Sequence, residues 1–214
     1  MEWVETMLCQ NGQIELLDLH LNRLKWGLYQ NNISTAESFI NLASKTILSN
    51  LPKDSKNYKV RYLLNIDSIG NFSESIESQL LKNFNNEIYQ IGIYTEQVKA
   101  INSPWNAKIT DRNIYQSALN WAKANNLDDA LIINSKGHLI ETSIFTIFIL
   151  KDDILYTPPL SDLPVKGVFR TWMIQNSIFP IIEQSLSEND IFSADLILLT
   201  NAVRGIRIGK MIQI

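Results

Sequence analysis

Between residues 130 and 157 the sequence alternates short apolar runs with turn-forming residues. Lys136-Gly137 and Asp152-Asp153 separate runs that are too short for helices and rich in isoleucine, leucine and phenylalanine. Runs of this length, bounded by turn residues, are typical of β-strands. We therefore predict a meander of short strands at Ala130–Asn134, His138–Ile140, Ile144–Leu150 and Ile154–Thr157.

One charged residue interrupts this apolar region. Glu141 follows Leu139 and Ile140 and lies within a stretch with the pattern of a strand. A carboxylate in apolar surroundings is costly unless it meets a cation or hydrogen-bond donors. Glu141 therefore either needs such a partner inside the protein or reaches water at the end of its strand.

The first part of the chain combines helical and strand patterns. From Leu17 onward, leucines recur at the i, i+4, i+7 and i+11 positions, which is the stripe of an amphipathic helix. A second helix is predicted at Ser34–Leu51, where Glu37 follows Ser34 with the spacing of a capping box. Strands are predicted at Trp3–Cys9, Tyr58–Asn65 and Ile88–Thr95.

The second part adds two helices and a further strand to the meander. Asp111 is placed to cap one helix, and another begins near Gly167 and runs through Trp172. Asp195–Thr200 has the apolar pattern of a buried strand. We expect an α/β (α+β) protein of two lobes, with a small domain at 1–97, a connector at 98–105 and a larger domain at 106–214.

Composition excludes several classes of function. The net charge is −3 and the basic residues are scattered, so the sequence does not predict a basic patch that would bind nucleic acid. Cys9 is the only cysteine, so neither an internal disulfide nor a cysteine-based zinc site is expected, and the two histidines lack the spacing of metal ligands. The longest apolar run is too short to cross a bilayer. We expect a cytoplasmic protein without a metal, a nucleic-acid partner or a membrane anchor.

Several polar positions could bind a ligand. His20 and Arg23 project from the same side of the first predicted helix. Gly167 precedes a helix whose first amides suit an anion, and Asn201-Ala202 follows a buried strand. Each has an ordinary structural explanation as well, as a surface pair, a common helix start or a simple turn. Lys108, taken alone, has the pattern of a solvated surface lysine.

The order of these segments resembles the class IV aminotransferases and aminodeoxychorismate lyases. These are two-lobed pyridoxal-phosphate enzymes of fold-type IV, of which D-amino acid aminotransferase is an example. The resemblance covers nearly the whole chain. It rests on Glu5-Thr6 with His20-Leu-Asn-Arg23, on Lys108 before Asp111-Arg112, on the strands ending in Glu141, on Leu163-Pro164 to Arg170, and on Thr200-Asn-Ala-Val-Arg-Gly205.

The resemblance implies that pyridoxal 5'-phosphate lies between the two lobes. Lys108 matches the lysine that carries the cofactor covalently and later moves a proton. Glu141 matches the carboxylate that pairs with the pyridine nitrogen, which would supply the cationic partner that its position calls for. A carboxylate there keeps the nitrogen protonated and strengthens the ring as an acceptor of electrons.

The resemblance also implies a set of phosphate ligands. Arg23 matches the phosphate-binding arginine, and the backbone amides of Val168 and Phe169 match a second group of donors. Asn201 and Ala202 complete the set. A dianionic phosphate suits a guanidinium together with several N–H donors.

Two reactions share this machinery. An aminodeoxychorismate lyase releases pyruvate and leaves 4-aminobenzoate, whereas an aminotransferase of the branched-chain or D-amino-acid type passes an amino group to a 2-oxo acid. The Asp111-Arg112 pair and the Asn-Ala-Val-Arg-Gly segment favour the lyase. Tyr115, seven residues after Lys108, does not match the tyrosine spacing of branched-chain enzymes. A third possibility is a homologue that binds the cofactor and has lost catalysis.

The expected substrate is a small amino compound, and the expected assembly is a homodimer. Arg61 resembles the arginine that binds the substrate carboxylate in some members. Thr146 stands where members usually carry asparagine, which alters the expected hydrogen bonding near Glu141. Members also extend further at both ends than this chain does, so we expect an unusual enclosure of the substrate.

Overall fold

The computed structural model describes residues 1–81, 88–98, 107–110 and 113–213. For residues 96–98 it describes the backbone alone. These residues form two compact units. The first holds residues 1–81 and 107–110, and the second holds residues 88–98 and 113–213. Asp111 and most of the predicted connector lie outside the described residues.

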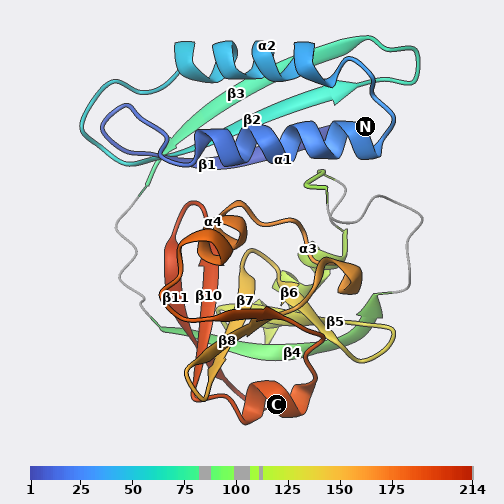
Figure 1. Ribbon diagram of the computed structural model, residues 1–214, viewed down its shortest axis with the longest axis vertical. Coiled ribbons are helices and arrows are strands. Elements are labelled where there is room, and N and C mark those ends of the chain that lie inside the picture. The colour runs from blue at the N-terminus through green and yellow to red at the C-terminus, as the bar shows by residue number, and fades with distance from the viewer. Residues whose placement is uncertain (82–87, 99–106, 111–112, 214) are drawn as a thin grey trace. The chain divides into compact units, whose positions relative to one another are not determined.

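The first unit is a two-layer structure of helices on a sheet (Figure 1). Its antiparallel sheet has the order β1-β2-β3, formed by Glu2–Cys9, Tyr58–Ile66 and Phe72–Leu80. Helices α1 (Leu17–Gln30) and α2 (Ala36–Ser49) pack on one face of it. Met7, Leu28 and Leu64 are fully buried between the layers. The leucine stripe predicted for α1 therefore faces the core.

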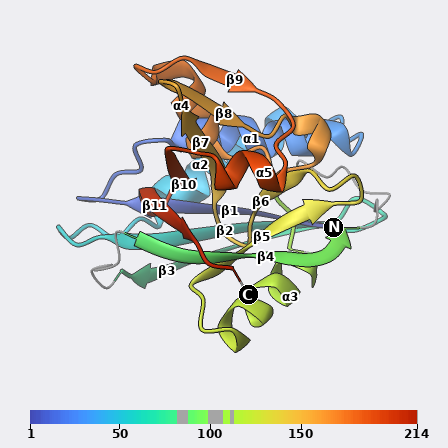
Figure 2. The ribbon, with the colours of Figure 1, turned by 90° about the horizontal axis from the view of Figure 1, so that it is seen from below.

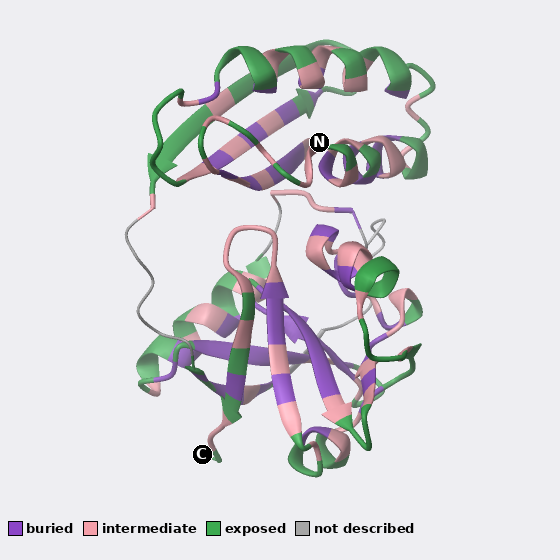
Figure 3. Cartoon of the chain, turned by 60° about the vertical axis from the view of Figure 1, so that its left-hand side comes forward, coloured by how far each residue is buried: buried purple, intermediate pink, exposed green. Residues whose placement is uncertain are grey.

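One strand of this unit was not predicted, and one local prediction was wrong. Strand β3 was not predicted, and Figure 3 shows that it is exposed along most of its length. The capping box at Ser34 is not formed, because the helix begins later, at Ala36. Thr35 precedes it without a side-chain capping bond among the described residues.

The second unit is built on a mixed eight-stranded sheet with the order β6-β5-β4-β11-β10-β7-β8-β9. The strands are β4 (Ile88–Val98), β5 (Asp129–Asn134), β6 (Leu139–Thr142), β7 (Thr146–Lys151), β8 (Ile154–Thr157), β9 (Ile181–Glu183), β10 (Leu196–Asn201) and β11 (Gly205–Met211). The helical segments are α3 (Asn113–Ala124), η1 (Leu160–Asp162), α4 (Val168–Asn176) and α5 (Glu188–Phe192). Helix α3 packs on β4 and β5 (Figure 2). The four strands of the predicted meander are present as β5 through β8, but they do not form a meander, because β4, β11 and β10 separate the β5-β6 pair from the β7-β8 pair.

The boundary between the units differs from the predicted one at two places. β4 belongs to the second unit, because it pairs in parallel with β5 and with β11. Residues 107–110 belong to the first unit, because they run along the free edge of β1. There the Val4 amide donates to the Lys108 carbonyl at 2.9 Å. The chain therefore enters the second unit and returns to the first before completing the second.

Candidate functional site

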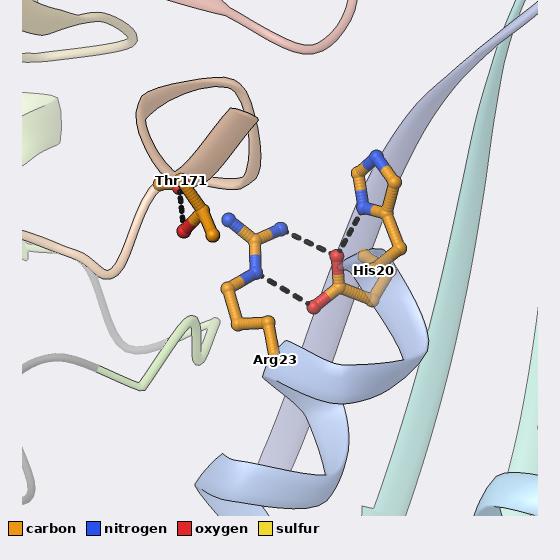
Figure 4. Close-up of polar contacts among 5 residues, drawn as sticks. His20, Arg23 and Thr171 are labelled. Atoms are coloured by element: carbon orange, nitrogen blue, oxygen red, sulfur yellow. Dashed lines mark hydrogen bonds and ion pairs between the residues drawn. The ribbon is translucent and has the colours of Figure 1, made fainter. Parts of the chain in front are cut away.

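A buried charged cluster lies between β1 and α1 in the first unit (Figure 4). Arg23 and His20 project from α1 toward the carboxylate of Glu5 on β1. Nε of Arg23 donates to Oε1 at 2.9 Å, its second terminal nitrogen contacts Oε2, and Nδ1 of His20 lies 2.6 Å from Oε2. All three side chains are at most 7% exposed. The three-residue spacing of His20 and Arg23 is what allows one carboxylate to meet both.

Burial and charge act in opposite directions on this cluster. Burial raises the pKa of Glu5, but the charge of Arg23 and the hydrogen bond with His20 outweigh it, so the pKa falls to about 2. For His20, burial is the largest influence and lowers its pKa, and the positive charges of Arg23 and Lys108 act in the same direction. Glu5 is therefore ionised and His20 is neutral at physiological pH.

Lys108 lies close enough to this cluster for its charge to act on His20. Its backbone is fixed by the edge of β1, where Trp3 and Ile109 form an antiparallel bridge. Ala107, on one side of it, approaches Gly27 of α1, because a Cβ at Gly27 would lie 3.4 Å from the Ala107 side chain. The structure thus brings Lys108 to the edge of β1, where its charge acts on His20, although the two residues are far apart in sequence.

Arg61 lies on the other face of the same sheet. Its register partners are Thr6 on β1 and Glu77 on β3, whereas Glu5 pairs with the buried Tyr62. Since neighbouring residues of a strand point to opposite faces, Arg61 and Glu5 face apart. Arg61 is 40% exposed, and its guanidinium lies 3.6 Å from Glu77. It is not part of the charged cluster.

Glu141, in the second unit, is 4% exposed and lies at the end of β6. Its Oε1 accepts from the Tyr115 hydroxyl at 2.6 Å and from the Val165 amide at 2.9 Å. The turn that follows β6 is anchored by the fully buried Asp129, which accepts from the Thr142 hydroxyl at 2.7 Å and from the Ser143 amide at 3.0 Å. The carboxylate therefore has a fixed place inside the unit.

The start of α4 offers backbone donors. The first amides of a helix have no partner within the helix, and the N-cap residue of α4, Gly167, has no side chain that could accept from them. A Cβ at Gly167 would lie 2.7 Å from Oγ1 of Thr146, so a side chain there would collide with the start of β7. Glycine allows the chain to pass close to Thr146, with the amides of Val168 and Phe169 in the first turn.

A turn between β10 and β11 lies beside the same place. Thr200 pairs with Thr146 across the sheet, and the Asn201 side chain donates to the Ile144 carbonyl at 3.1 Å. Oδ1 of Asn201 accepts from the amides of Val203 and Arg204 at 3.0 and 2.7 Å, which closes the turn around Ala202. The second unit thus brings the predicted α4 and β10 positions together around Thr146.

These groups fit pyridoxal phosphate on chemical grounds. The segment from Val165 to Gly167 joins the buried carboxylate of Glu141 to the donor-rich start of α4. A carboxylate suits a protonated ring nitrogen, and the first turn of a helix suits a phosphate. Within the first unit taken by itself, the guanidinium of Arg23 is also a group that suits a phosphate.

The sequence comparison decides the family. The family model described as amino-transferase class IV matches residues 2–212. The chain belongs to the class IV aminotransferase family. This is a family of pyridoxal-phosphate-dependent enzymes.

One relative matches part of the chain by sequence. A protein of Methanocaldococcus jannaschii assigned as a branched-chain-amino-acid aminotransferase is 29% identical over 100 residues. The matched part is 44% of this chain and only 35% of that protein.

Solved structures of this class share the fold over nearly the whole chain. A structure from Mesorhizobium loti assigned as an amino-acid aminotransferase has a TM-score of 0.82 and 21% identity, covering 99% of both chains. One from Legionella pneumophila assigned as a 4-amino-4-deoxychorismate lyase has a TM-score of 0.78 and 22% identity, covering 98% of this chain and 82% of that one. An aminotransferase from Brucella abortus bound to pyridoxal phosphate has a TM-score of 0.81 and 16% identity, covering 98% and 80%. The predicted α/β fold of fold-type IV is confirmed.

Sequence reasoning missed three residues that shape the candidate site. Glu5 was noted only as part of the resemblance, although it interrupts the apolar series of Trp3, Met7 and Cys9 on one face of β1. That interruption was an available signal, of the same kind as the one at Glu141. Tyr115 and Asp129 gave no signal, because their partners lie far away in the sequence.

Proposed function

We propose that this chain is a pyridoxal-phosphate enzyme in which Lys108 carries the cofactor. Arg23 and the amides of Val168 and Phe169, with Asn201 and Ala202, would hold the phosphate, and Glu141 would pair with the ring nitrogen. The observation that carries the proposal is the direct link from Glu141 through Val165 to the start of α4. When bound, the cofactor supplies an electron-accepting ring for a bond broken at the α-carbon of the substrate.

Each residue would act through a property that the structure shows. Glu141 is buried and already held by two donors, so it can keep a proton on a ring nitrogen without moving. Arg23 is fixed by Glu5, so its guanidinium is oriented in advance. Lys108 would take up and return the proton at its Nζ, and its positive charge helps to keep His20 neutral.

The reaction that we propose is the cleavage of 4-amino-4-deoxychorismate to pyruvate and 4-aminobenzoate. The Thr200–Gly205 segment and its resemblance to the lyase branch support it, as does the likeness to the Legionella structure. Transfer of an amino group from an amino acid is the second candidate, supported by the Methanocaldococcus relative. In either case we propose that Arg61, half-exposed on its face of the sheet, binds the substrate carboxylate.

The first experiment tests the cofactor. We expect purified protein supplied with pyridoxal phosphate to be yellow, and borohydride reduction to leave the cofactor's mass on the peptide that contains Lys108. Lys108→Ala should lose this label and all turnover while keeping the fold by circular dichroism. The matched control is Lys136→Ala, in an exposed turn, which should retain both. A label at another lysine, or turnover by Lys108→Ala, would overturn the assignment.

The second experiment separates the reactions. Aminodeoxychorismate is supplied and pyruvate is measured, beside an assay of amino transfer from glutamate to branched-chain 2-oxo acids. Pyruvate release alone supports the lyase, and transfer alone supports the aminotransferase. Cofactor binding without either activity would identify a homologue that has lost catalysis. The homodimer and the cytoplasmic location stay predictions from the sequence.

No helix among the described residues combines the length and the apolar character needed to cross a bilayer.

A further inference from the structure

The phenol of Tyr115 makes a short bond to the carboxylate that the proposed function assigns to the ring nitrogen. Its hydroxyl donates to Oε1 of Glu141 at 2.6 Å. This length is typical of a hydrogen bond from a hydroxyl to an ionised oxygen, which is stronger than one between neutral groups. Since Glu141 is 4% exposed, water competes little for the same oxygen.

Three separate elements meet at this oxygen. Tyr115 lies in the first turn of α3, Glu141 lies on β6, and the Val165 amide precedes α4. The Tyr115 ring packs against a hydrophobic cluster that includes Ala118 and Ile140. The phenol is therefore anchored by its ring, and its hydroxyl reaches Glu141 from a rigid helix.

Two donors on one oxygen have two consequences. They fix the rotation of the carboxylate, and they stabilise its charged form, because hydrogen bonds to a carboxylate favour ionisation. A carboxylate can accept about four hydrogen bonds, so these two donors do not saturate it. A proton shared between this group and a ring nitrogen would then remain on the nitrogen.

We propose that Tyr115 is a positioning residue that enables Glu141 to recognise a protonated ring nitrogen. The inference rests on the proposed function and deepens it. Tyr115 would act through Glu141, by helping the carboxylate to keep the ring nitrogen protonated, and it need not touch the cofactor. Sequence spacing gave Tyr115 no role, because it does not match the tyrosine position of the branched-chain enzymes.

The test compares two ligands on two proteins. The ligands are pyridoxal phosphate and its carbocyclic analogue, in which a CH group replaces the ring nitrogen. The proteins are the unaltered chain and Tyr115→Phe, which keeps the packed ring and removes only the hydroxyl. Equilibrium dialysis gives the four dissociation constants, and thermal unfolding of the ligand-free proteins checks the fold.

A matched control exists in the other unit. Tyr58 also donates to a carboxylate, that of Asp54 at 2.8 Å, but at an exposed position. Tyr58→Phe removes the same kind of bond and should leave both dissociation constants unchanged.

We expect Tyr115→Phe to weaken the binding of pyridoxal phosphate about tenfold and that of the analogue less than about twofold, as the loss of one charge-assisted bond predicts. An equal loss for both ligands, or no loss for either, would overturn the proposal, since a merely structural tyrosine does not distinguish the ring nitrogen. Failure of the unaltered chain to bind pyridoxal phosphate would instead reject the proposed function itself. The two failures are therefore distinguishable.

Discussion

Arg23 contacts both carboxylate oxygens of Glu5, with its Nε donating to Oε1 at 2.9 Å and its second terminal nitrogen meeting Oε2. Both side chains are at least nine-tenths buried. A guanidinium held at two points has one orientation, and it keeps that orientation before any ligand arrives. The pair also joins β1 to α1, so the stability of the first unit depends on it.

Glu5→Gln should destabilise the protein by about 3–5 kcal/mol, because it leaves the buried charge of Arg23 without its counter-ion. Urea unfolding measures the change. Adding Arg23→Met should recover part of the loss, so the two substitutions should not be additive. Glu37→Gln is the control. It removes the solvent-exposed carboxylate of α2 that pairs with Lys25 of α1, and it should change the unfolding free energy little. Additive losses would show that the pair is not coupled.

Acid should weaken the protein through Glu5. Its pKa is about 2 in the folded state and 4.5 in the ordinary state, so the unfolded chain binds more protons between these values. The stability that Glu5 contributes is therefore complete above pH 4.5 and is lost as the pH falls toward 2. The difference in unfolding free energy between the original chain and Glu5→Gln, measured from pH 7 downward, should shrink in this window. A difference that stays constant would contradict the assignment.

Gly167→Ala tests the close approach between α4 and β7. The backbone of Gly167 has φ −61°, which alanine adopts freely, so the effect comes only from the Cβ placed 2.7 Å from Oγ1 of Thr146. We expect a loss of about 1–3 kcal/mol from overpacking. Thr146→Ala should reduce that loss in the double variant, whereas Thr146→Ser keeps the oxygen and should not. If Gly167→Ala cost the same stability in the Thr146→Ala variant as in the Thr146→Ser variant, the steric explanation would be rejected.

Asp129→Asn should loosen the turn that follows Glu141. Both oxygens of Asp129 accept hydrogen bonds, from the Thr142 hydroxyl and the Ser143 amide. Asparagine would place an N–H group against one of these donors, at a cost of about 1–3 kcal/mol. Asp195→Asn is the control, because Asp195 accepts the Asp152 amide at an exposed site and should stay within about 0.5 kcal/mol. Thermal unfolding measures both losses. Equal stability of the two variants would show that Asp129 does not hold the turn.

Most helices and strands could be predicted because their apolar residues follow a clear period. β3 could not, since Phe72, Ile76 and Leu80 recur every four residues, a helical spacing, and its other positions are polar. Such a strand is held mainly by backbone pairing with β2, while Ile76 packs against the core and Phe72 against Phe39. β4 was predicted as a strand but assigned to the wrong unit, because the sequence does not reveal which strands it pairs with.

The candidate site shows the same division. Glu141 could be predicted because a carboxylate in an apolar strand requires a partner, and the start of α4 could be predicted from Gly167. The partners themselves could not, since Tyr115, Val165 and Glu141 meet only through the fold. Lys108 carries no signal in composition or periodicity, and only the resemblance to the family selected it.

The bridge between Trp3 and Ile109 has a consequence for synthesis of the chain. The free edge of β1 stays uncovered on the ribosome until residue 110 has emerged, by which time β4 of the second unit has also been made. A nascent chain that stalls after β3 would present β1 and β3 as two open edges, each able to pair with another chain. Residues 107–110 therefore cover the edge of β1 late in synthesis. A fragment that ends after β3 should aggregate through its open strand edges more readily than the chain that carries these residues.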